Sequence, residues 1–510
     1  MTNNNSNEKF MVMNKSKLEN CDVSLECSIN LETTETVDKV LSINVNAEKV
    51  TCESLIGEAN FTGTAVVDLV YITTDGNIYT ATYISPFSGK IQNQKINTNT
   101  KVCVKPLSLN GEVNSIYSQV AKVNLYMTFD GFAYNNEEVE YLANVESDVC
   151  TKMEEQSYVT LENETNSSWT ENVYAEVKEP IKQVLYTNSE VYVKNVDIGT
   201  NYVAVSCELE NDIAYLTDEE NPKIKIVHTK NEIKQEVECE YATKDKSCDV
   251  DLSIQKSNVK ANIEQKEDDI KIALVIPLDV CVRVYNTQTQ TIIKDLYSTE
   301  RQTTITMSSF ENQVPCEPIN FDKKVEGSLV VDENEPRIDK LLAVNYSKAI
   351  ITNEYIDNGT YNVSGVIQSN LIYFNEDEAK VCALDIEIPF AVSTQVDYDG
   401  TVLLDTDVKV CDVDVLVKKG RDVYVDATLK VRSNVCKTTT GAVISELNYL
   451  EEYPQKDCAI EIYFAKAGEN TWDIAKKLNI NEEQLYNQNP ELKEILEKDE
   501  KLAIYYKLEK

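Results

Sequence analysis

The chain has 510 residues, and at roughly 150 residues per domain this length predicts three or four domains. Hydrophobic residues make up 42% of it, which is enough for several packed cores and excludes a wholly disordered chain. Asp and Glu number 86 against 49 Lys and Arg, for a formal charge of −37, so nucleic-acid binding is disfavoured by repulsion from the phosphates. The single histidine, His228, argues against histidine-based metal sites and catalytic triads, and we expect no metal and no cofactor.

Fourteen cysteines lie between Cys21 and Cys458 without any C-x-x-C pair, which argues against zinc ribbons and thioredoxin-like redox sites. The first twenty residues are rich in asparagine and lack the apolar stretch of a secretory signal. No run of 18 apolar residues is present, so we expect no membrane span. These features predict a cytosolic chain whose cysteines are reduced thiols.

About the first 450 residues alternate apolar and polar side chains and are rich in Val, Ile, Thr and Tyr, which is typical of antiparallel strands with one packed and one solvated face. Residues 422–432 are the clearest case, because every second residue from Val423 to Val431 is apolar. A hairpin turn is predicted before this strand at 418–421. Asp-Gly turns are predicted at 75–76, 130–131 and 399–400.

An internal repeat predicts the domain organisation. Similar pentamers occur at 37–41, 181–185 and 338–342, and each is followed by a long strand that carries a tyrosine near its end: Tyr71, Tyr215 and Tyr373. The second halves also match, since residues 258–274 resemble residues 412–429. We therefore predict three tandem antiparallel β-sandwich-like domains with the tyrosines at equivalent positions. The polar segments 151–173, 306–330 and 441–459 are expected to be connectors.

The hydrophobic period changes from about residue 460 onward and predicts a strand, two short helices and a closing strand. Asn470 is placed to cap the first helix with Asp473 as its capping-box partner, and Asn481 is placed to cap the second, with Gln484 at its third position. The pair 489–490, Asn-Pro, is expected to end the second helix. The apolar contacts of the first helix are assigned to Trp472, Ile474, Ala475 and Leu478.

This C-terminal pattern resembles a LysM domain, a small β-α-α-β module. The matching residues are Gly468, Trp472, Ile474, Ala475, Leu485, Asn489, Pro490, Lys501 and Leu502. In that family two loops flank a shallow groove for N-acetylglucosamine polymers. Here the first loop contains Glu469 and Asn470, and the usual Pro-Gly of the second loop is replaced by Asp499 and Glu500. The resemblance implies a partner-binding surface formed by Gly468, Glu469, Asn470, Trp472, Asn489, Pro490, Asp499 and Glu500.

Three β repeats followed by a LysM module resemble the clostridial spore-coat morphogenetic proteins of the SipL-like family, whose repeats are called SPOCS domains. The resemblance implies a mainly β fold with a polar N-terminal arm (1–24), SPOCS-like domains at 25–150, 174–305 and 331–440, and a LysM domain at 460–507. It also implies a non-enzymatic spore-coat assembly protein in the mother-cell cytoplasm, at the forespore surface and coat. The implied partners are the coat ATPase of the SpoIVA type, which the LysM engages, and other coat proteins.

Two other functions stay open. The module is also compatible with a cell-envelope protein that binds peptidoglycan through N-acetylglucosamine polymers, and an unrecognised carboxylate pair is compatible with a hydrolase. Against an enzyme, the sequence has no glycine-rich phosphate loop, no nucleophile elbow and no H-E-x-x-H motif.

Overall fold

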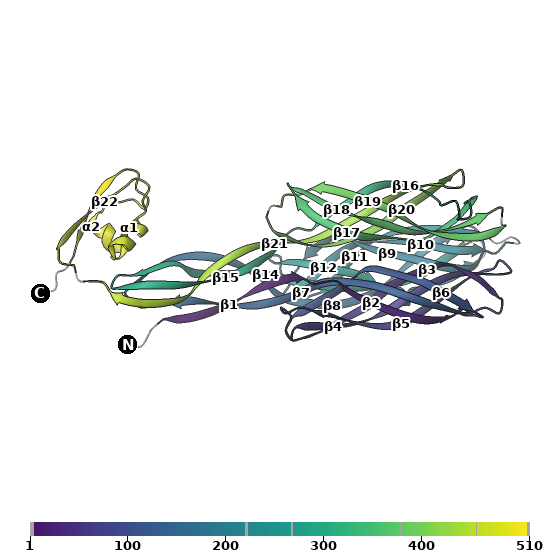
Figure 1. Ribbon diagram of the computed structural model, residues 1–510, viewed down its shortest axis with the longest axis horizontal. Helices are drawn as coiled ribbons and strands as arrows, with labels where there is room; N and C mark the ends of the chain where they lie inside the picture. The colour runs from purple at the N-terminus through teal and green to yellow at the C-terminus, as the bar shows by residue number, and fades with distance from the viewer. Residues whose placement is uncertain are drawn as a thin grey trace.

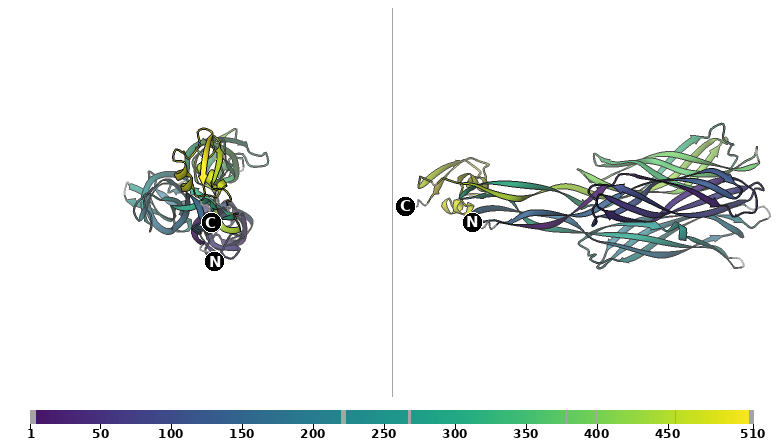
Figure 2. Two further views of the ribbon diagram at one scale, coloured as in Figure 1. Left: turned by 90° about the vertical axis from the view of Figure 1, so that its left-hand side faces the viewer. Right: turned by 60° about the horizontal axis from the view of Figure 1, so that its bottom comes forward.

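The protein was analysed as a computed structural model that describes residues 5–219, 223–266, 269–377, 379–398, 400–454 and 456–506. It is mainly β, with several antiparallel sheets, as the sequence predicts. Three elongated lobes lie side by side around a common long axis, and a stem of long strands leaves them at one end (Figures 1 and 2). A small module with two helices lies at the far end of the stem, where the described chain also begins (Figure 1).

Lobe 1 is a sandwich of two sheets. In one sheet β4 lies between β3 and β5, and in the other β7 pairs with both β2 and β6. The strands are β2 (Cys21–Asn30), β3 (Val37–Leu55), β4 (Glu58–Thr73), β5 (Ile78–Gln92), β6 (Lys101–Tyr117) and β7 (Val120–Asn144). The inward residues of both sheets form one apolar core, in which Phe61, Phe87 and Phe129 pack ring against ring.

Lobes 2 and 3 repeat this arrangement. Lobe 2 contains β9 (Ile181–Ile198), β10 (Tyr202–Thr217) and β11 (Ile224–Glu238) in one sheet, and β8 (Val149–Val177), β12 (Ser247–Ile254), β13 (Lys260–Lys266) and β14 (Asp269–Ser298) in the other. Lobe 3 contains β17 (Lys340–Asp357), β18 (Thr360–Asn375) and β19 (Lys380–Gln395), with β16 (Ile319–Val330), β20 (Val402–Lys418) and β21 (Asp422–Glu452) opposite. Where lobes 1 and 3 use one strand, β6 or β20, lobe 2 uses two, β12 and β13, separated by the 3-10 turn η1 (Lys256–Asn258).

The repeat tyrosines lie at equivalent positions, which confirms that prediction. Each is buried, lies two residues before the end of the middle strand of its sheet and opposes the fourth residue of its pentamer. The three pairs are Tyr71 with Val40, Tyr215 with Val184 and Tyr373 with Leu341. The three lobes therefore share strand register as well as strand order.

The stem consists of three two-stranded ribbons, one from each lobe. The end of β7 pairs with β1 (Ser6–Lys17), the outer parts of β8 and β14 pair with each other, and the end of β21 pairs with β15 (Arg301–Pro315). A lone two-stranded ribbon is marginal in water. Here each ribbon buries one face against the other two, with Phe10 packed on Tyr158 and Phe310 at ring-centroid distances of 4.6 and 5.5 Å.

Three sequence predictions require correction. The segments expected to be connectors are for the most part strands of the stem and lobes, because their polar residues form the outer faces of ribbons. The described part of the third segment that follows Glu452 lies outside the strands, as the sequence predicts for a connector. The expected turn at Asp130–Gly131 lies inside β7, and the glycine is needed because a Cβ there would meet the Cys103 carbonyl oxygen at 2.1 Å. The outer face of 422–432 is not wholly solvated, because Lys430 and Arg432 are buried between lobes.

Other local predictions hold. The hairpin turn at 418–421 joins β20 to β21, and the turn at 75–76 joins β4 to β5. Asp399 of the third predicted turn lies outside the described residues, as do residues 1–4 of the predicted arm and residue 507 of the predicted module. The rest of the arm forms β1 and the start of β2. The limits of the three β domains stay predictions.

All fourteen cysteines are free. Among the described residues, no helix has the length and apolar character needed to cross a membrane.

Candidate interaction surface on the C-terminal module

The C-terminal module has the predicted β-α-α-β order. It contains β22 (Ile460–Ala465), α1 (Thr471–Leu478), α2 (Glu482–Gln488) and β23 (Glu500–Tyr505), and the two strands pair antiparallel. The helices pack on one face of this sheet, where Ala465, Leu502 and Ile504 are buried. The module is therefore built around a single apolar layer between sheet and helices.

Asparagines define the helix ends, as the sequence predicts. The Asn470 side chain accepts a hydrogen bond from the Asp473 backbone N–H at 2.7 Å and donates one to the Asp473 carboxylate at 2.6 Å. Asn481 caps α2 by accepting from the Glu483 N–H at 2.8 Å. Gln484 does not complete a capping box there, because its side chain donates to the Tyr505 carbonyl at 3.3 Å.

The predicted rim residues at the first loop are engaged within the module. Gly468 is exposed and adopts φ +90°, a conformation that suits glycine. Glu469 accepts hydrogen bonds from the Lys466 backbone N–H at 2.9 Å, from Tyr463 at 3.1 Å and from Lys477 at 2.7 Å. The Lys477 hydrogen bond, followed by the backbone bond, lowers the pKa of Glu469 below its ordinary value.

The other predicted rim residues also serve the fold. Asp499 accepts from the Ala467 backbone N–H at 2.9 Å and so joins the two loops. Asn489 ends α2 and exchanges two hydrogen bonds with the backbone of Ala503 on β23, at 3.1 and 3.2 Å. Pro490 follows it and is exposed, and Glu500 begins β23. The structure thus brings Gly468, Glu469, Asn470 and Asp499 together at one end, whereas Asn489 lies beside the middle of β23.

Trp472 contacts the stem of its own chain. Its indole N–H donates to Asp295 of β14 at 2.8 Å, and Lys476, one turn further along α1, donates to the same carboxylate at 2.6 Å. Tyr297 packs edge-on against the indole at 5.0 Å and donates a buried hydrogen bond to the Ile480 carbonyl at 2.7 Å. Trp472 is only 8% exposed. Its predicted role in partner binding stays a prediction.

Burial alone would raise the pKa of Asp295, but the hydrogen bonds from Lys476 and Trp472 outweigh burial, so the pKa lies below its ordinary value. Asp295 is therefore an ionised anchor that holds α1 on the tip of the stem near neutral pH.

The opposite face of the module's sheet is apolar and open. Ile460, Ile462 and Phe464 alternate along β22 on this face and are 53%, 58% and 66% exposed. Across the sheet they oppose Tyr505, Ala503 and Lys501 of β23. The Lys501 ammonium lies 5.4 Å from the centre of the Phe464 ring. We call Ile460, Ile462, Phe464 and Tyr505 the exposed sheet face.

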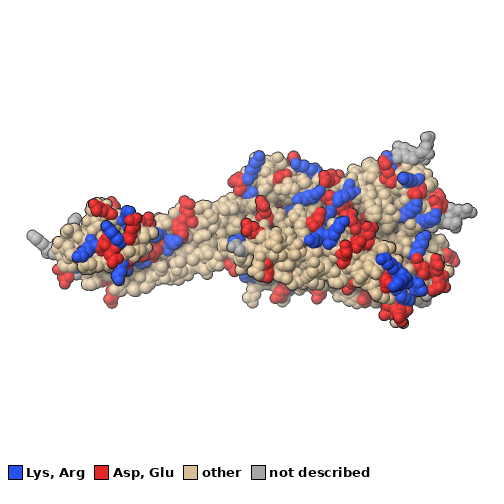
Figure 3. Space-filling view, turned by 90° about the horizontal axis from the view of Figure 1, so that it is seen from above, with Lys and Arg blue, Asp and Glu red and all other residues tan. Residues whose placement is uncertain are grey.

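Sequence reasoning missed this surface because it looked for a loop-flanked groove. The signal was present in the strand itself: in IEIYFA the apolar residues Ile460, Ile462 and Phe464 share one face, while Ala465 already supplies the face toward the helices. A surface strand with apolar residues on both faces indicates a second contact surface. Figure 3 shows mixed charges on the module and few charges on the visible face of the stem.

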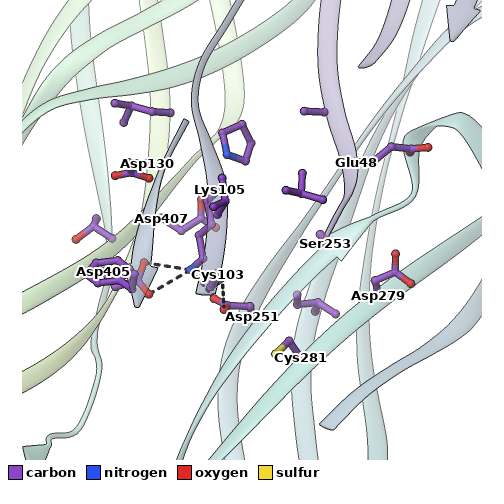
Figure 4. A pocket seen from close by; sticks show the side chains of 18 of the residues that line it. Glu48, Cys103, Lys105, Asp130, Asp251, Ser253, Asp279, Cys281, Asp405 and Asp407 are labelled. Carbon is purple, nitrogen blue, oxygen red and sulfur yellow. Dashed lines mark hydrogen bonds and ion pairs between the residues drawn. The ribbon is translucent and has the colours of Figure 1, made fainter. Parts of the chain in front are cut away.

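A second concentration of polar groups lies where the lobes meet. Lys105 of lobe 1 donates to Asp251 of lobe 2 at 2.6 Å and to Asp405 of lobe 3 at 3.0 Å (Figure 4). Arg283 donates to Asp251 at 2.7 Å and to Glu164 at 3.0 Å. Lys105 and Arg283 together hold the pKa of Asp251 well below its ordinary value, against the effect of burial. The Lys105 pairs link the three lobes, whereas the Arg283 pairs lie within lobe 2. All of these residues border an axial cavity of about 1560 Å³.

Comparison with protein families gives a match within lobe 2. Residues 180–262 match the family model described as SipL, SPOCS domain. The matched segment spans β9 to β12, the turn η1 and the start of β13, which is most of lobe 2. Neither the comparison with curated proteins nor the comparison with solved structures gives a match. Lobe 2 is thus similar to the SPOCS domain of SipL.

Proposed function

We propose that this protein is a non-enzymatic spore-coat assembly protein that recruits or anchors coat layers on the forespore surface. The SPOCS match in lobe 2 supports a sporulation role. Lobes 1 and 3 share the strand order and register of lobe 2, which supports two further SPOCS-like domains. The β-α-α-β order and the capping pattern support a LysM-type module at residues 460–506.

The observation that carries the proposal is the exposed sheet face at the tip of the molecule. Large aliphatic and aromatic side chains that share one open face are typical of protein-protein contacts, whose central residues become desolvated on binding. Ile460, Ile462 and Phe464 supply such a centre, and Lys501 supplies a positive charge at its margin. The partner we propose is the coat ATPase of the SpoIVA type, with other coat proteins bound by the lobes.

The rim residues favour a protein partner over a glycan. A sugar polymer is held largely by hydrogen bonds from the loops, and such bonds need free polar groups. Glu469 and Asp499 already bond to backbone N–H groups within the module. Charge reversal at Asp499 would therefore disturb the loops as well as the surface charge, so Glu500 is the cleaner position for testing charge.

A fluorescent fusion of the full chain in sporulating cells tests this function. We expect fluorescence to surround the forespore within the mother cell and to depend on the presence of the coat ATPase. Fluorescence on the cell wall, together with co-sedimentation of the purified full chain with peptidoglycan, would replace this function by the glycan-binding alternative. Fluorescence spread evenly through cells under both conditions would contradict both functions.

A further inference from the structure

The sheet of the C-terminal module has two outer edges, and hydrogen bonds occupy them unequally. Its two strands, β22 and β23, pair with each other and with no other strand of the described chain. In an antiparallel pair, successive residues direct their backbone N–H and C=O groups alternately toward the partner strand and away from it. Every second residue of each strand therefore presents its backbone groups at an outer edge, where they need another partner.

The outer edge of β23 is closed by side chains from the end of α2. Asn489 accepts a hydrogen bond from the Ala503 N–H at 3.1 Å and donates one to the Ala503 carbonyl at 3.2 Å. Two residues further along β23, Gln488 accepts from the Tyr505 N–H at 2.9 Å and donates to the Tyr505 carbonyl at 3.0 Å. A side-chain amide thus takes the place of a third strand at both residues.

The outer edge of β22 has no such cover. Just before this strand, the Tyr506 N–H donates to the Ala459 carbonyl at 3.0 Å, so the backbone groups of Ala459 face the partner strand. The alternation then directs the backbone groups of Ile460, Ile462 and Phe464 away from β23. Within the described part of the chain, no hydrogen bond from another strand, a loop or a side chain reaches these groups. We call the backbone of these three residues the free edge.

The free edge belongs to the same residues as the exposed sheet face. Ile460, Ile462 and Phe464 carry the exposed apolar side chains of β22. The strand contains no proline and its pairing with β23 has no bulge, two features that keep further strands off an edge. Its one charged residue, Glu461, is already bonded to Lys456 at 2.8 Å. A straight, apolar edge of this kind is a template for another strand.

We propose that the free edge binds an extended segment of the partner protein as a third strand of the module's sheet. This inference rests on the proposed function, because it describes how the module would hold the coat ATPase. The three outward-facing residues offer both donors and acceptors to the backbone of the incoming segment. Their side chains contact every second side chain of that segment, which we therefore expect to be apolar.

The charges beside the free edge add one requirement for the segment. Lys501 lies opposite Phe464 in the sheet, and Lys466 follows two residues after it. Both lysines are exposed, and neither forms an ion pair with a described residue. An acidic residue at the end of the segment that lies beside Phe464 would complement these charges.

Binding of the purified coat ATPase to full-length Ile462→Pro and Ile462→Ala variants, measured by isothermal titration, tests the free edge. Proline removes the outward N–H of residue 462 and is compatible with an edge strand at such a position, so pairing with β23 is kept. Alanine is the matched control, because it keeps the N–H and removes most of the apolar side chain. We expect proline to weaken binding at least about tenfold more than alanine does.

The titration separates this inference from the proposed function. Equal losses in the two variants would overturn strand addition and leave docking through the exposed sheet face in place. Absence of binding by the unchanged chain would overturn the proposed function, and the inference with it.

Amide hydrogen exchange resolved to single residues gives a test that needs no variant. In the unbound chain we expect fast exchange at Ile460, Ile462 and Phe464 and slow exchange at Glu461 and Tyr463, which face β23. Bound ATPase should slow exchange at the first three by about tenfold or more. Unchanged exchange there while the ATPase is bound would overturn the proposal. Exchange that slows with rising chain concentration in the absence of the ATPase would assign the free edge to a second copy and overturn it too.

Discussion

The lobes and the C-terminal module differ in where their apolar and charged side chains lie. In the lobes most large apolar residues are inside, although some, such as Ile56 and Tyr117, are exposed. Even charged groups such as Lys430, Glu208 and Arg283 are buried where lobes meet. In the module one sheet face is packed and the other exposes Ile460, Ile462 and Phe464. Surfaces that bury their own charges are already satisfied within the chain, whereas an open apolar face gains free energy only when a partner covers it. The difference supports the proposal that the exposed sheet face of the module makes an external contact.

The largest expected effect is on the free energy of unfolding, which should fall when an aromatic residue of lobe 1 is removed and stay nearly unchanged when one of the module is removed. Phe129→Ala removes a fully buried ring that packs on Phe61 and Phe87, and we expect it to lower the free energy of unfolding by about 3–5 kcal/mol. Phe464→Ala is the matched control, because that ring is mostly exposed and its loss is expected to change stability by about 0.5 kcal/mol or less. Denaturant unfolding of both variants gives the comparison. Equal losses would mean that the module face is covered within the chain.

Trp472→Ala is expected to act on the module alone. The indole is nearly buried between the module core and the stem, so its removal should cost the module about 3–5 kcal/mol at most. Amide hydrogen exchange should speed up within residues 460–506 and stay unchanged in the lobes. Faster exchange that extended through β10 and β18 would show that module and lobes unfold as one unit.

Glu190→Gln tests whether charges at the contact between lobes stabilise the fold. Glu190 lies 2.8 Å from Lys256 of its own lobe and 3.4 Å from Lys409 of lobe 3. The pKa of Glu190 falls from an ordinary 4.5 to about 2 in the folded chain, so its ionised form stabilises the fold fully above pH 4.5 and loses this contribution as the pH falls toward 2. The variant should be less stable than the unchanged chain by roughly 3 kcal/mol at neutral pH. Unfolding measured from pH 7 downward should show the gap closing below pH 4.5. A gap that is constant with pH would remove the electrostatic explanation.

The smallest effect concerns the contact between module and stem. Asp295→Asn removes the charge that Trp472 and Lys476 share, which should weaken docking by about 1.5–3 kcal/mol without unfolding either part. Small-angle X-ray scattering should then show a broader distribution of module positions. Glu154→Gln, on an exposed stem ion pair with Lys294, is the control and should leave the scattering unchanged. Identical curves for both variants would show that the packing of Trp472 on Tyr297 holds the module without the Asp295 charge.

Local rules predicted much of this structure. Alternation located the strands, the tyrosine spacing located equivalent positions in three lobes, and Asn470 and Asp473 located the start of α1. Long-range pairing could not be obtained in this way. Residues 151–173 have a polar, acidic composition like that of a linker, yet β8 is paired along its length with β14, from Val177 with Ile270 to Val149 with Ser298. The packing of Trp472 against Tyr297 of the stem could not be predicted from local sequence patterns either.

For the candidate interaction surface, too, local features could be predicted from the sequence and long-range packing could not. Resemblance pointed to the loops around Gly468 and Asp499, and the structure shows that Glu469 and Asp499 use their carboxylates to hold those loops. The exposed sheet face became visible only when the helices were seen to cover the other side of the sheet. Periodicity identifies which residues share a face, but it does not say which face remains uncovered.

Binding of the purified coat ATPase to full-length Phe464→Ser and Glu469→Ala variants tests docking through the exposed sheet face most directly. Isothermal titration beside the unchanged chain, with circular dichroism to confirm folding, gives the comparison. We expect Phe464→Ser to weaken binding by about tenfold or more, and Glu469→Ala to bind within about twofold of the unchanged chain. Unchanged binding by Phe464→Ser together with loss of binding by Glu469→Ala would contradict docking through this face and return the site to the loops.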